Sequence, residues 1–183
     1  MVRTESPICD FDLPAIDFNL KGVDGKRYNL ESLKGSNGLL VMFICNHCPY
    51  VNSIIQRIIS DTKALIPIGI NSVAIMSNDA NAYQEDSFEN MKIISSKLKF
   101  PFPYLLDDTQ EVAKSYGAVC TPDFFGYNKE LGLQYRGRFD ESRRESAVNA
   151  RRDLFEAMSS IASTGKGPRE QIPSIGCSIK WIE

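Results

Sequence analysis

The stretch that decides the fold is an apolar run ending in two cysteines, Leu39-Leu-Val-Met-Phe-Ile-Cys-Asn-His-Cys-Pro49. Its first six residues are almost purely apolar and predict a buried central strand. An amphipathic helix follows, because the apolar residues from Val51 to Ile66 recur at helical spacing. Pro49 suits the first turn of that helix, where its missing N–H is not needed. The two cysteines therefore lie where a strand passes into a helix.

This placement predicts a redox-active dithiol. A thiolate at a helix start is stabilised by unpaired backbone N–H groups and by the positive end of the helix dipole. Two cysteines separated by two residues can also close a disulfide. We expect Cys45 to be the exposed nucleophile, since it precedes the helix, and Cys48 to be the buried resolving thiol. His47, the sole histidine, is expected to favour the Cys45 thiolate and to make the disulfide a stronger oxidant.

Two other interpretations of the cysteine pair compete with this one. A zinc site would need two more soft ligands at a matching spacing, but Cys9, Cys120 and Cys177 are isolated along the sequence. An inert buried pair is disfavoured because the strand-to-helix placement is the one that redox chemistry needs. We therefore expect no metal and no cofactor beyond the disulfide between Cys45 and Cys48.

The remaining patterns predict an α/β sandwich around a mixed sheet. They indicate a hairpin over 17–30, a strand over 72–76, a helix over 88–98, a strand over 104–106, a short helix capped by Asp108 and Glu111 and ending near Gly117, a hairpin of 124–127 with 133–138, and a last helix over 147–161. We expect a single domain with its core over 12–162. Residues 163–183 are expected to form a poorly packed linker and an apolar tail that docks through Ile175, Ile179 and Trp181.

Composition excludes several classes of partner. The 21 Lys plus Arg and 23 Asp plus Glu give a net charge of −2, so nothing electrostatic favours nucleic acid or an anionic membrane. No apolar run approaches the roughly 18 residues of a membrane span, and the first twenty residues contain no signal-peptide core. Five cysteines are too few for a disulfide scaffold. We expect a cytoplasmic protein, whose oligomeric state the sequence does not define.

Motifs along nearly the whole chain carry a resemblance to a known family. They are Cys45-Asn-His-Cys-Pro49, Ser77-Asn-Asp79, Glu85-Asp-Ser-Phe-Glu-Asn-Met91, Phe100-Pro-Phe-Pro-Tyr104, Gly117-Ala-Val-Cys-Thr-Pro-Asp-Phe-Phe125, Tyr135-Arg-Gly-Arg-Phe-Asp140 and Pro173-Ser-Ile-Gly-Cys-Ser-Ile-Lys-Trp181. Together they resemble the peroxiredoxin-like branch of the redoxin proteins (alkyl hydroperoxide reductase/thiol-specific antioxidant), which have the thioredoxin fold.

The resemblance implies a thioredoxin-like three-layer sandwich with a central mixed sheet, an N-terminal hairpin, a helix–strand insertion over about 84–106 and a C-terminal tail. It implies that Pro122 is cis and lies against the C-x-x-C turn. It also implies that Thr121 offers its backbone to an extended substrate segment beside Cys45. Thr121 and Pro122 thereby join the redox motif as predicted catalytic residues.

The sequence departs from its relatives in two ways. Peroxiredoxins carry P-x-x-x-[TS]-x-x-C, and alignment on Cys48 places Val41 and Cys45 at the Pro and Ser/Thr positions. A peroxidase built on a bare Cys45 thiolate should therefore be slow. Thioredoxins also carry a buried Asp on the strand before the motif, and 39–44 contains no acid. The proton acceptor for Cys48 is therefore unassigned.

The leading hypothesis is a thiol–disulfide oxidoreductase acting on protein or small-molecule disulfides and thiols. Cys45 would attack a substrate disulfide, Cys48 would resolve the mixed disulfide, and an external thiol or reductase would restore the dithiol. One alternative is a thiol-dependent peroxidase, a peroxiredoxin-like antioxidant in which Cys45 passes through sulfenic acid. Another is a non-catalytic redox sensor or binding module. Cys120 and Cys177 are each either a small buried hydrophobe or an additional redox partner.

Overall fold

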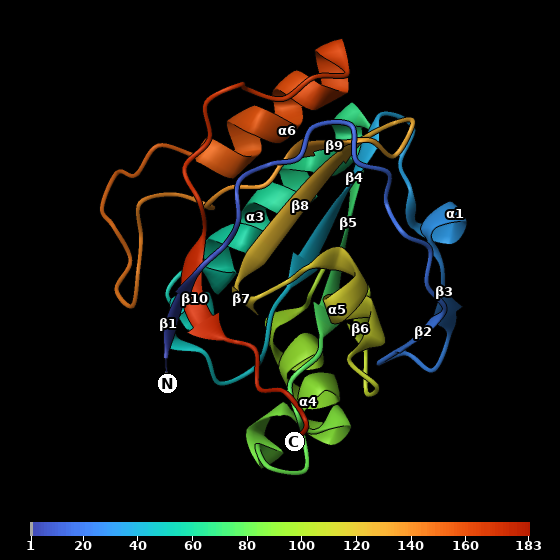
Figure 1. The fold of residues 1–183 in the computed structure, drawn as a ribbon, viewed down its shortest axis with the longest axis vertical. Helices are drawn as coiled ribbons and strands as arrows, with labels where there is room; N and C mark the ends of the chain where they lie inside the picture. Colours follow the sequence, from blue (N-terminus) through green and yellow to red (C-terminus); the bar gives the residue numbers. More distant parts are fainter. Residues whose placement is uncertain (1) are drawn as a thin grey trace.

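The computed structural model describes residues 2–183, which fold into two sheets with helices packed around the larger one (Figure 1). The strands are β1 (Arg3–Glu5), β2 (Leu20–Gly22), β3 (Arg27–Tyr28), β4 (Gly38–Phe43), β5 (Ile70–Met76), β6 (Tyr104–Leu106), β7 (Cys120–Thr121), β8 (Asp123–Asn128), β9 (Leu133–Tyr135) and β10 (Ile175–Ser178). The helices are α1 (Leu30–Leu33), α2 (Pro49–Asn52), α3 (Ile55–Leu65), α4 (Phe88–Leu98), α5 (Glu111–Tyr116) and α6 (Asp153–Thr164), with 3₁₀ turns η1 (Ile66–Ile68) and η2 (Gln84–Asp86).

The larger sheet is mixed and has the order β3-β2-β6-β5-β4-β8-β9. Its central strand β4 runs parallel to β5 and antiparallel to β8, and all six of its residues are buried. Successive side chains of a strand point to opposite faces. Leu40 and Met42 accordingly pack in one core with α3 and α6, whereas Val41 and Phe43 pack in a second core with α1 and α5. This arrangement confirms the three-layer sandwich.

The N-terminal hairpin, the insertion and the hairpin after Pro122 all form as predicted. β2 pairs antiparallel with β3, and β8 pairs antiparallel with β9. In the insertion, α4 occupies the predicted range and leads to β6, which pairs parallel to β5. Within the described part of the chain, no helix has the length and apolar character needed to cross a bilayer.

The amphipathic segment after the cysteines is two helices and not one. α2 ends at Asn52 and α3 begins at Ile55, with Ile54 between them at φ −122° and ψ −5°. The Ser53 hydroxyl donates hydrogen bonds to the carbonyls of Tyr50 and Arg143 at this break. Such local side-chain hydrogen bonds compete with regular helix geometry and explain the interruption.

The predicted start of α5 is wrong. The residue before its first turn is Gln110, which has a left-handed backbone (φ 63°) and makes no capping bond with its side chain. The carboxylate of Asp107 instead accepts hydrogen bonds from the backbone N–H groups of Val112 and Ala113, at 3.3 and 2.9 Å. A fully buried acid thus takes the role predicted for Asp108 and Glu111.

The last helix begins later than predicted. α6 starts at Asp153, and Val148, which the pattern assigned to its apolar face, is 86% exposed. Asn149 has a left-handed backbone with φ 55°, which interrupts helical geometry before the true start. The apolar face of α6 is therefore formed by residues from Leu154 onward.

The C-terminal tail packs on the rest of the chain as a strand. β10 lies between β1 and β7, antiparallel to both, and forms a second sheet with them (Figure 1). Ile179 is buried, whereas Trp181 is 40% exposed and lies under the Lys114 ammonium, so the prediction that Trp181 packs into the body is wrong. The tail nevertheless reaches the end of the larger sheet where the cysteines lie.

Candidate active site

The redox motif follows the central strand directly. β4 ends at Phe43, Cys48 is the cap residue of α2, and Pro49 occupies the first helical position. Both cysteines are buried: Cys48 is fully covered and Cys45 is 3% exposed. The prediction that Cys45 is the exposed member of the pair is therefore wrong. The residues that surround it come from distant parts of the sequence.

The first of these neighbours is the peptide bond between Thr121 and Pro122, which is cis, as the resemblance implied. The Thr121 hydroxyl lies 3.4 Å from Cys45 Sγ, and the Thr121 carbonyl accepts a hydrogen bond from the Cys48 thiol at 3.1 Å. The cis bond thus lies against the motif, and Thr121 contacts both sulfurs.

His47 faces a buried acid. Its Nδ1 atom lies 2.7 Å from Asp86 Oδ2, at ion-pair distance but without the alignment of a hydrogen bond. Its ring stacks parallel to the Tyr83 ring, with 5.6 Å between centroids. We expected the imidazole to support a thiolate at Cys45. Its pairing with a carboxylate offsets that effect, because the negative charge of Asp86 disfavours an anion on the same sulfur.

Asp86 also fixes the backbone of the motif. Its carboxylate accepts hydrogen bonds from the Asn46 backbone N–H and from the Asn78 side-chain amide, both at 2.8 Å. The Asn46 amide oxygen in turn accepts a hydrogen bond from the Tyr104 hydroxyl at 2.9 Å. Sequence reasoning missed Asp86, which occurs in the quoted motif Glu85–Met91 but has no spacing that relates it to the cysteines.

The two thiols of the motif ionise as a coupled pair. Their interaction lowers the pKa of Cys48 to about 5, with burial opposing it and Cys177 and Thr121 assisting it. The same interaction, together with burial and the charge of Asp86, raises the pKa of Cys45. The first ionisation belongs to the pair and not to either sulfur alone.

The two remaining candidate redox residues lie in different surroundings. Cys177 is buried on β10, and its sulfur lies 3.2 Å from Cys48 Sγ. Burial and the neighbouring Cys48 raise the pKa of Cys177 to about 12. Cys120 is also buried, and its thiol donates to the Pro122 carbonyl at 3.5 Å. Burial raises the pKa of Cys120 as well.

Three groups of the site could serve as metal ligands. One ligand atom each from Cys45, His47 and Asp86 all lie within 4.8 Å of one another. Thiolate, imidazole and carboxylate are donors that zinc accepts. The sequence disfavoured zinc because the other cysteines are isolated, and it did not reveal the carboxylate. That the site works without a metal stays a prediction.

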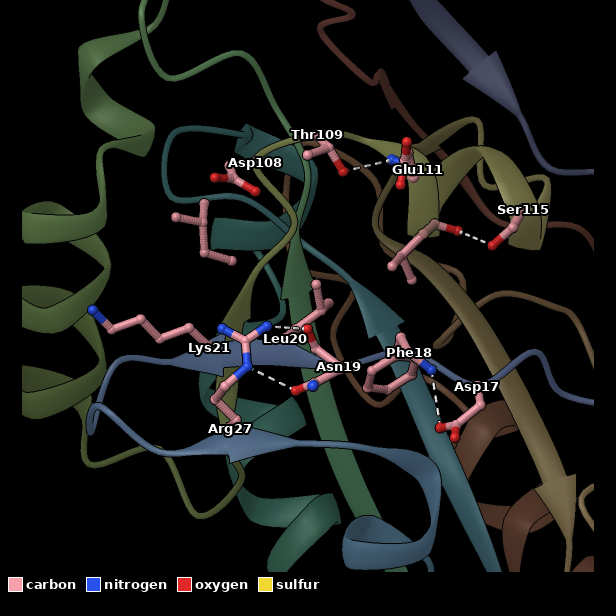
Figure 2. Close-up of a pocket in the computed structure, with 12 residues that line it drawn as sticks. Asp17, Phe18, Asn19, Leu20, Lys21, Arg27, Asp108, Thr109, Glu111 and Ser115 are labelled. Atoms are coloured by element: carbon pink, nitrogen blue, oxygen red, sulfur yellow. Dashed lines mark hydrogen bonds between the residues drawn. The ribbon is translucent and has the colours of Figure 1, made fainter.

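A surface cavity lies at a part of the molecule that contains none of the cysteines. It has a volume of about 530 Å³ and lies between β2 and α5 (Figure 2). Its lining includes Asp17, Lys21, Arg27, Asp108 and Glu111, and none of the five cysteines. The Arg27 guanidinium is directed at Asn19, whose side chain accepts from Nε at 2.8 Å. The cavity therefore offers no thiol chemistry and is separate from the candidate site.

The fold and the dithiol beside a cis-proline define a thioredoxin-fold protein. The thioredoxin domain of a thiol-disulfide oxidoreductase from Bacteroides vulgatus is similar, with a TM-score of 0.59 and 18% identity over 73% of this chain and 89% of that chain. Residues 12–139 match the model of the AhpC/TSA family. The chain therefore belongs to the AhpC/TSA family, which confirms the resemblance found in the sequence.

Two solved structures resemble nearly the whole chain. An uncharacterized conserved protein from Geobacillus kaustophilus has 42% identity and a TM-score of 0.94, over 100% of this chain and 97% of that one. A hypothetical protein from Sinorhizobium meliloti has 38% identity and a TM-score of 0.93, over 98% of each chain. No curated protein matches this chain.

Proposed function

We propose that the protein is a thiol–disulfide oxidoreductase in which Cys45 and Cys48 alternate between dithiol and disulfide. The observation that carries this proposal is the position of both thiols against Thr121, which precedes the cis peptide bond and contacts both sulfurs. The lowered pKa of Cys48 favours a thiolate in the pair at neutral pH, which is the form that attacks a disulfide. Family membership supports the same class of chemistry.

The reaction transfers two electrons to the substrate. As the pair loses a proton, the Cys45 sulfur attacks one sulfur of a substrate disulfide, forms a mixed disulfide and expels the first substrate thiolate. The Cys48 thiolate then attacks Cys45, forms the disulfide Cys45–Cys48 and expels the second thiolate. The two protons lost by Cys45 and Cys48 balance the two substrate thiolates, so the dithiol is oxidised to a disulfide as the substrate disulfide is reduced to two thiols. An external thiol or reductase reverses the sequence and restores the dithiol.

The cover over the site restricts the substrate to small disulfides. Cys45 is 3% exposed, and the backbone of Thr121 is already paired with Cys177 of β10. The resemblance implied that Thr121 receives an extended substrate segment, but β10 occupies that edge. We therefore propose low-molecular-mass disulfides as substrates in preference to polypeptides.

A thiol-dependent peroxidase is a second candidate, because the family is that of alkyl hydroperoxide reductase and thiol-specific antioxidant proteins and a peroxide is smaller than a disulfide substrate. The Cys45 thiolate would take the distal peroxide oxygen, giving sulfenic acid and an alcohol or water. Cys48 would then condense with it, releasing water and closing the disulfide. Val41 and Cys45 still replace the peroxiredoxin Pro and Ser/Thr, so we expect a slow rate.

Parallel assays distinguish these functions. Reduced protein is mixed with oxidised glutathione, with insulin or with hydrogen peroxide, and the loss of its free thiols is followed over time. We expect rapid reaction with glutathione disulfide and slow reaction with insulin, with both abolished in Cys45→Ser and retained in Cys120→Ser. Faster reaction with peroxide than with either disulfide would replace the proposal by the second candidate. Reaction with none of them would favour the redox sensor.

A further inference from the structure

Strand β10 brings a third cysteine into the redox site. In the register between β10 and β7, Cys177 lies opposite Thr121, the residue that contacts both sulfurs of the motif. The two backbones approach so closely that a Cβ atom on Gly176 would lie 2.1 Å from the Thr121 carbonyl oxygen. A glycine at this position is therefore required for β10 to reach the motif.

The sulfur of Cys177 points at Cys48. The two Sγ atoms lie 3.2 Å apart, and Cys48 also shares the C-x-x-C motif with Cys45. A disulfide needs a sulfur–sulfur distance of about 2.05 Å, so the two sulfurs have only about 1.2 Å to close. Cys48 is thus the central sulfur of three and has a bonding partner on either side.

Hydrogen bonds on both sides of Cys177 in the sequence hold its sulfur beside Cys48. Before Cys177, the Ser174 hydroxyl donates to the Pro122 carbonyl at 2.7 Å. After Cys177, the Lys180 backbone N–H donates to the Asn78 side chain at 2.9 Å. Holding two reacting groups in place in this way makes their encounter effectively unimolecular.

We propose that Cys177 is a third redox-active residue, whose thiol exchanges with the Cys45–Cys48 disulfide to form Cys48–Cys177 and release Cys45. This proposal rests on the proposed function, which supplies the first disulfide. The Cys177 thiolate attacks the Cys48 sulfur, the bond between Cys45 and Cys48 breaks, and Cys45 leaves with the electron pair. The proton lost by Cys177 is balanced by the one that Cys45 takes up, so no further oxidant or reductant is needed.

The charge on Cys48 favours formation of the Cys45–Cys48 disulfide before the Cys48–Cys177 disulfide. In the reduced site, burial raises the pKa of Cys177 first, and the hydrogen bond to Cys48 and its charge raise it further. When Cys48 enters a disulfide it loses its charge, so the Cys48 contribution disappears, while Lys180 and Arg144 continue to favour an anion on Cys177. Cys177 therefore becomes easier to ionise only after the first disulfide has formed. The exchange returns Cys45 to the thiol state and stores the oxidation between Cys48 and the tail.

Disulfide mapping of the intact protein tests this exchange. Trypsin separates the relevant cysteines, since Cys45 and Cys48 share the peptide 35–57, Cys177 lies in 170–180 and Cys120 in 115–129. Reduced protein is oxidised with oxidised glutathione, quenched with N-ethylmaleimide at successive times, digested and analysed by mass spectrometry. We expect the disulfide within 35–57 first, and then a cross-link of 35–57 to 170–180 that carries N-ethylmaleimide on Cys45.

Three variants make the result decisive. We expect Cys45→Ser, oxidised with diamide, to retain the cross-link, Cys48→Ser to reduce it at least tenfold, and Cys120→Ser to leave it unchanged. If the disulfide within 35–57 forms but no cross-link appears in the wild type or in Cys45→Ser, the role of Cys177 is refuted and the proposed function stands. A cross-link with the label on Cys48 would also refute it. If neither disulfide forms, the proposed function itself fails.

Discussion

Replacing Asp86 by Asn should lower the pKa of Cys45. The carboxylate lies within 4.8 Å of the Cys45 sulfur and is fully buried. A unit charge at that distance contributes about 3.5 kcal/mol at an effective dielectric constant of 20, and about 0.9 kcal/mol in water. The Asn46 backbone N–H and the Asn78 side-chain amide, which donate hydrogen bonds to the carboxylate, screen part of this charge. We therefore expect the lower part of the range, a decrease of about one pKa unit, or about 1.4 kcal/mol.

The measurement needs a protein in which Cys45 titrates alone. In the Cys48→Ser background, Cys45 is the only cysteine of the peptide 35–57. The pH dependence of its alkylation by iodoacetamide, read from that peptide by mass spectrometry, gives its pKa. Asp86→Asn in this background should move the midpoint toward lower pH and speed alkylation at neutral pH.

A matched control separates charge from general damage. Asp107 is another fully buried acid. Its carboxylate accepts hydrogen bonds from the first turn of α5 and not from the redox motif. Asp107→Asn should leave the Cys45 midpoint unchanged although it also destabilises the fold. An unchanged or higher midpoint in Asp86→Asn, with the variant folded by circular dichroism, would refute the assignment of Asp86 as the charge that suppresses the Cys45 thiolate.

Three further outcomes are expected. His47→Ala leaves the nearby carboxylate uncompensated, so the alkylation midpoint of Cys45 should rise and the reduction potential should fall; a potential that rises would contradict this. Gly176→Ala drives a methyl group into the Thr121 carbonyl, and thermal unfolding should reveal a loss of about 1–3 kcal/mol, whereas an unchanged melting temperature would show that β10 can shift freely. The pKa of Cys48 is lowered from 9.0 to about 5, so its stabilising contribution is complete above pH 9 and is lost as pH falls through 5. Between pH 7 and pH 5 the reduced protein should lose about 2 kcal/mol more than Cys48→Ser in urea unfolding, and parallel curves would disprove the shift.

The parts of the fold that sequence reasoning predicted are those with a local cause. The apolar run of β4, the alternation around the Asp24–Gly25 turn and the helical period of α4 each depend on neighbouring residues. The redox motif was found for the same reason, since a strand, two cysteines and a proline are consecutive. The cis bond before Pro122 came from the family resemblance, because X-Pro bonds are cis only about 5% of the time.

The features that sequence reasoning did not place depend on contacts between residues that are distant in the sequence. Asp86 lies 40 residues from Asn46, whose backbone it holds, and Cys177 lies 129 residues from Cys48. Neither pairing leaves a periodic signal, so the sequence offered Cys177 as one of two possible redox partners without placing it against Cys48, and it did not relate Asp86 to the motif at all. The burial of Cys45 also follows from contacts with distant residues. The local pattern of a helix start predicted an exposed thiol, and the tertiary structure buries it. The late start of α6 has a different cause, because Asn149 adopts a left-handed backbone that apolar spacing does not reveal.

The strand that covers the dithiol comes much later in the sequence than the residues it covers. β4, α2 and β7 can assemble while the chain is still growing, but the edge of β7 stays open until residues 175–178 are made. A chain shortened before residue 175 would therefore lack the pairing partner of β7, and we expect its Cys45 and Cys48 thiols to be more accessible than in the full chain.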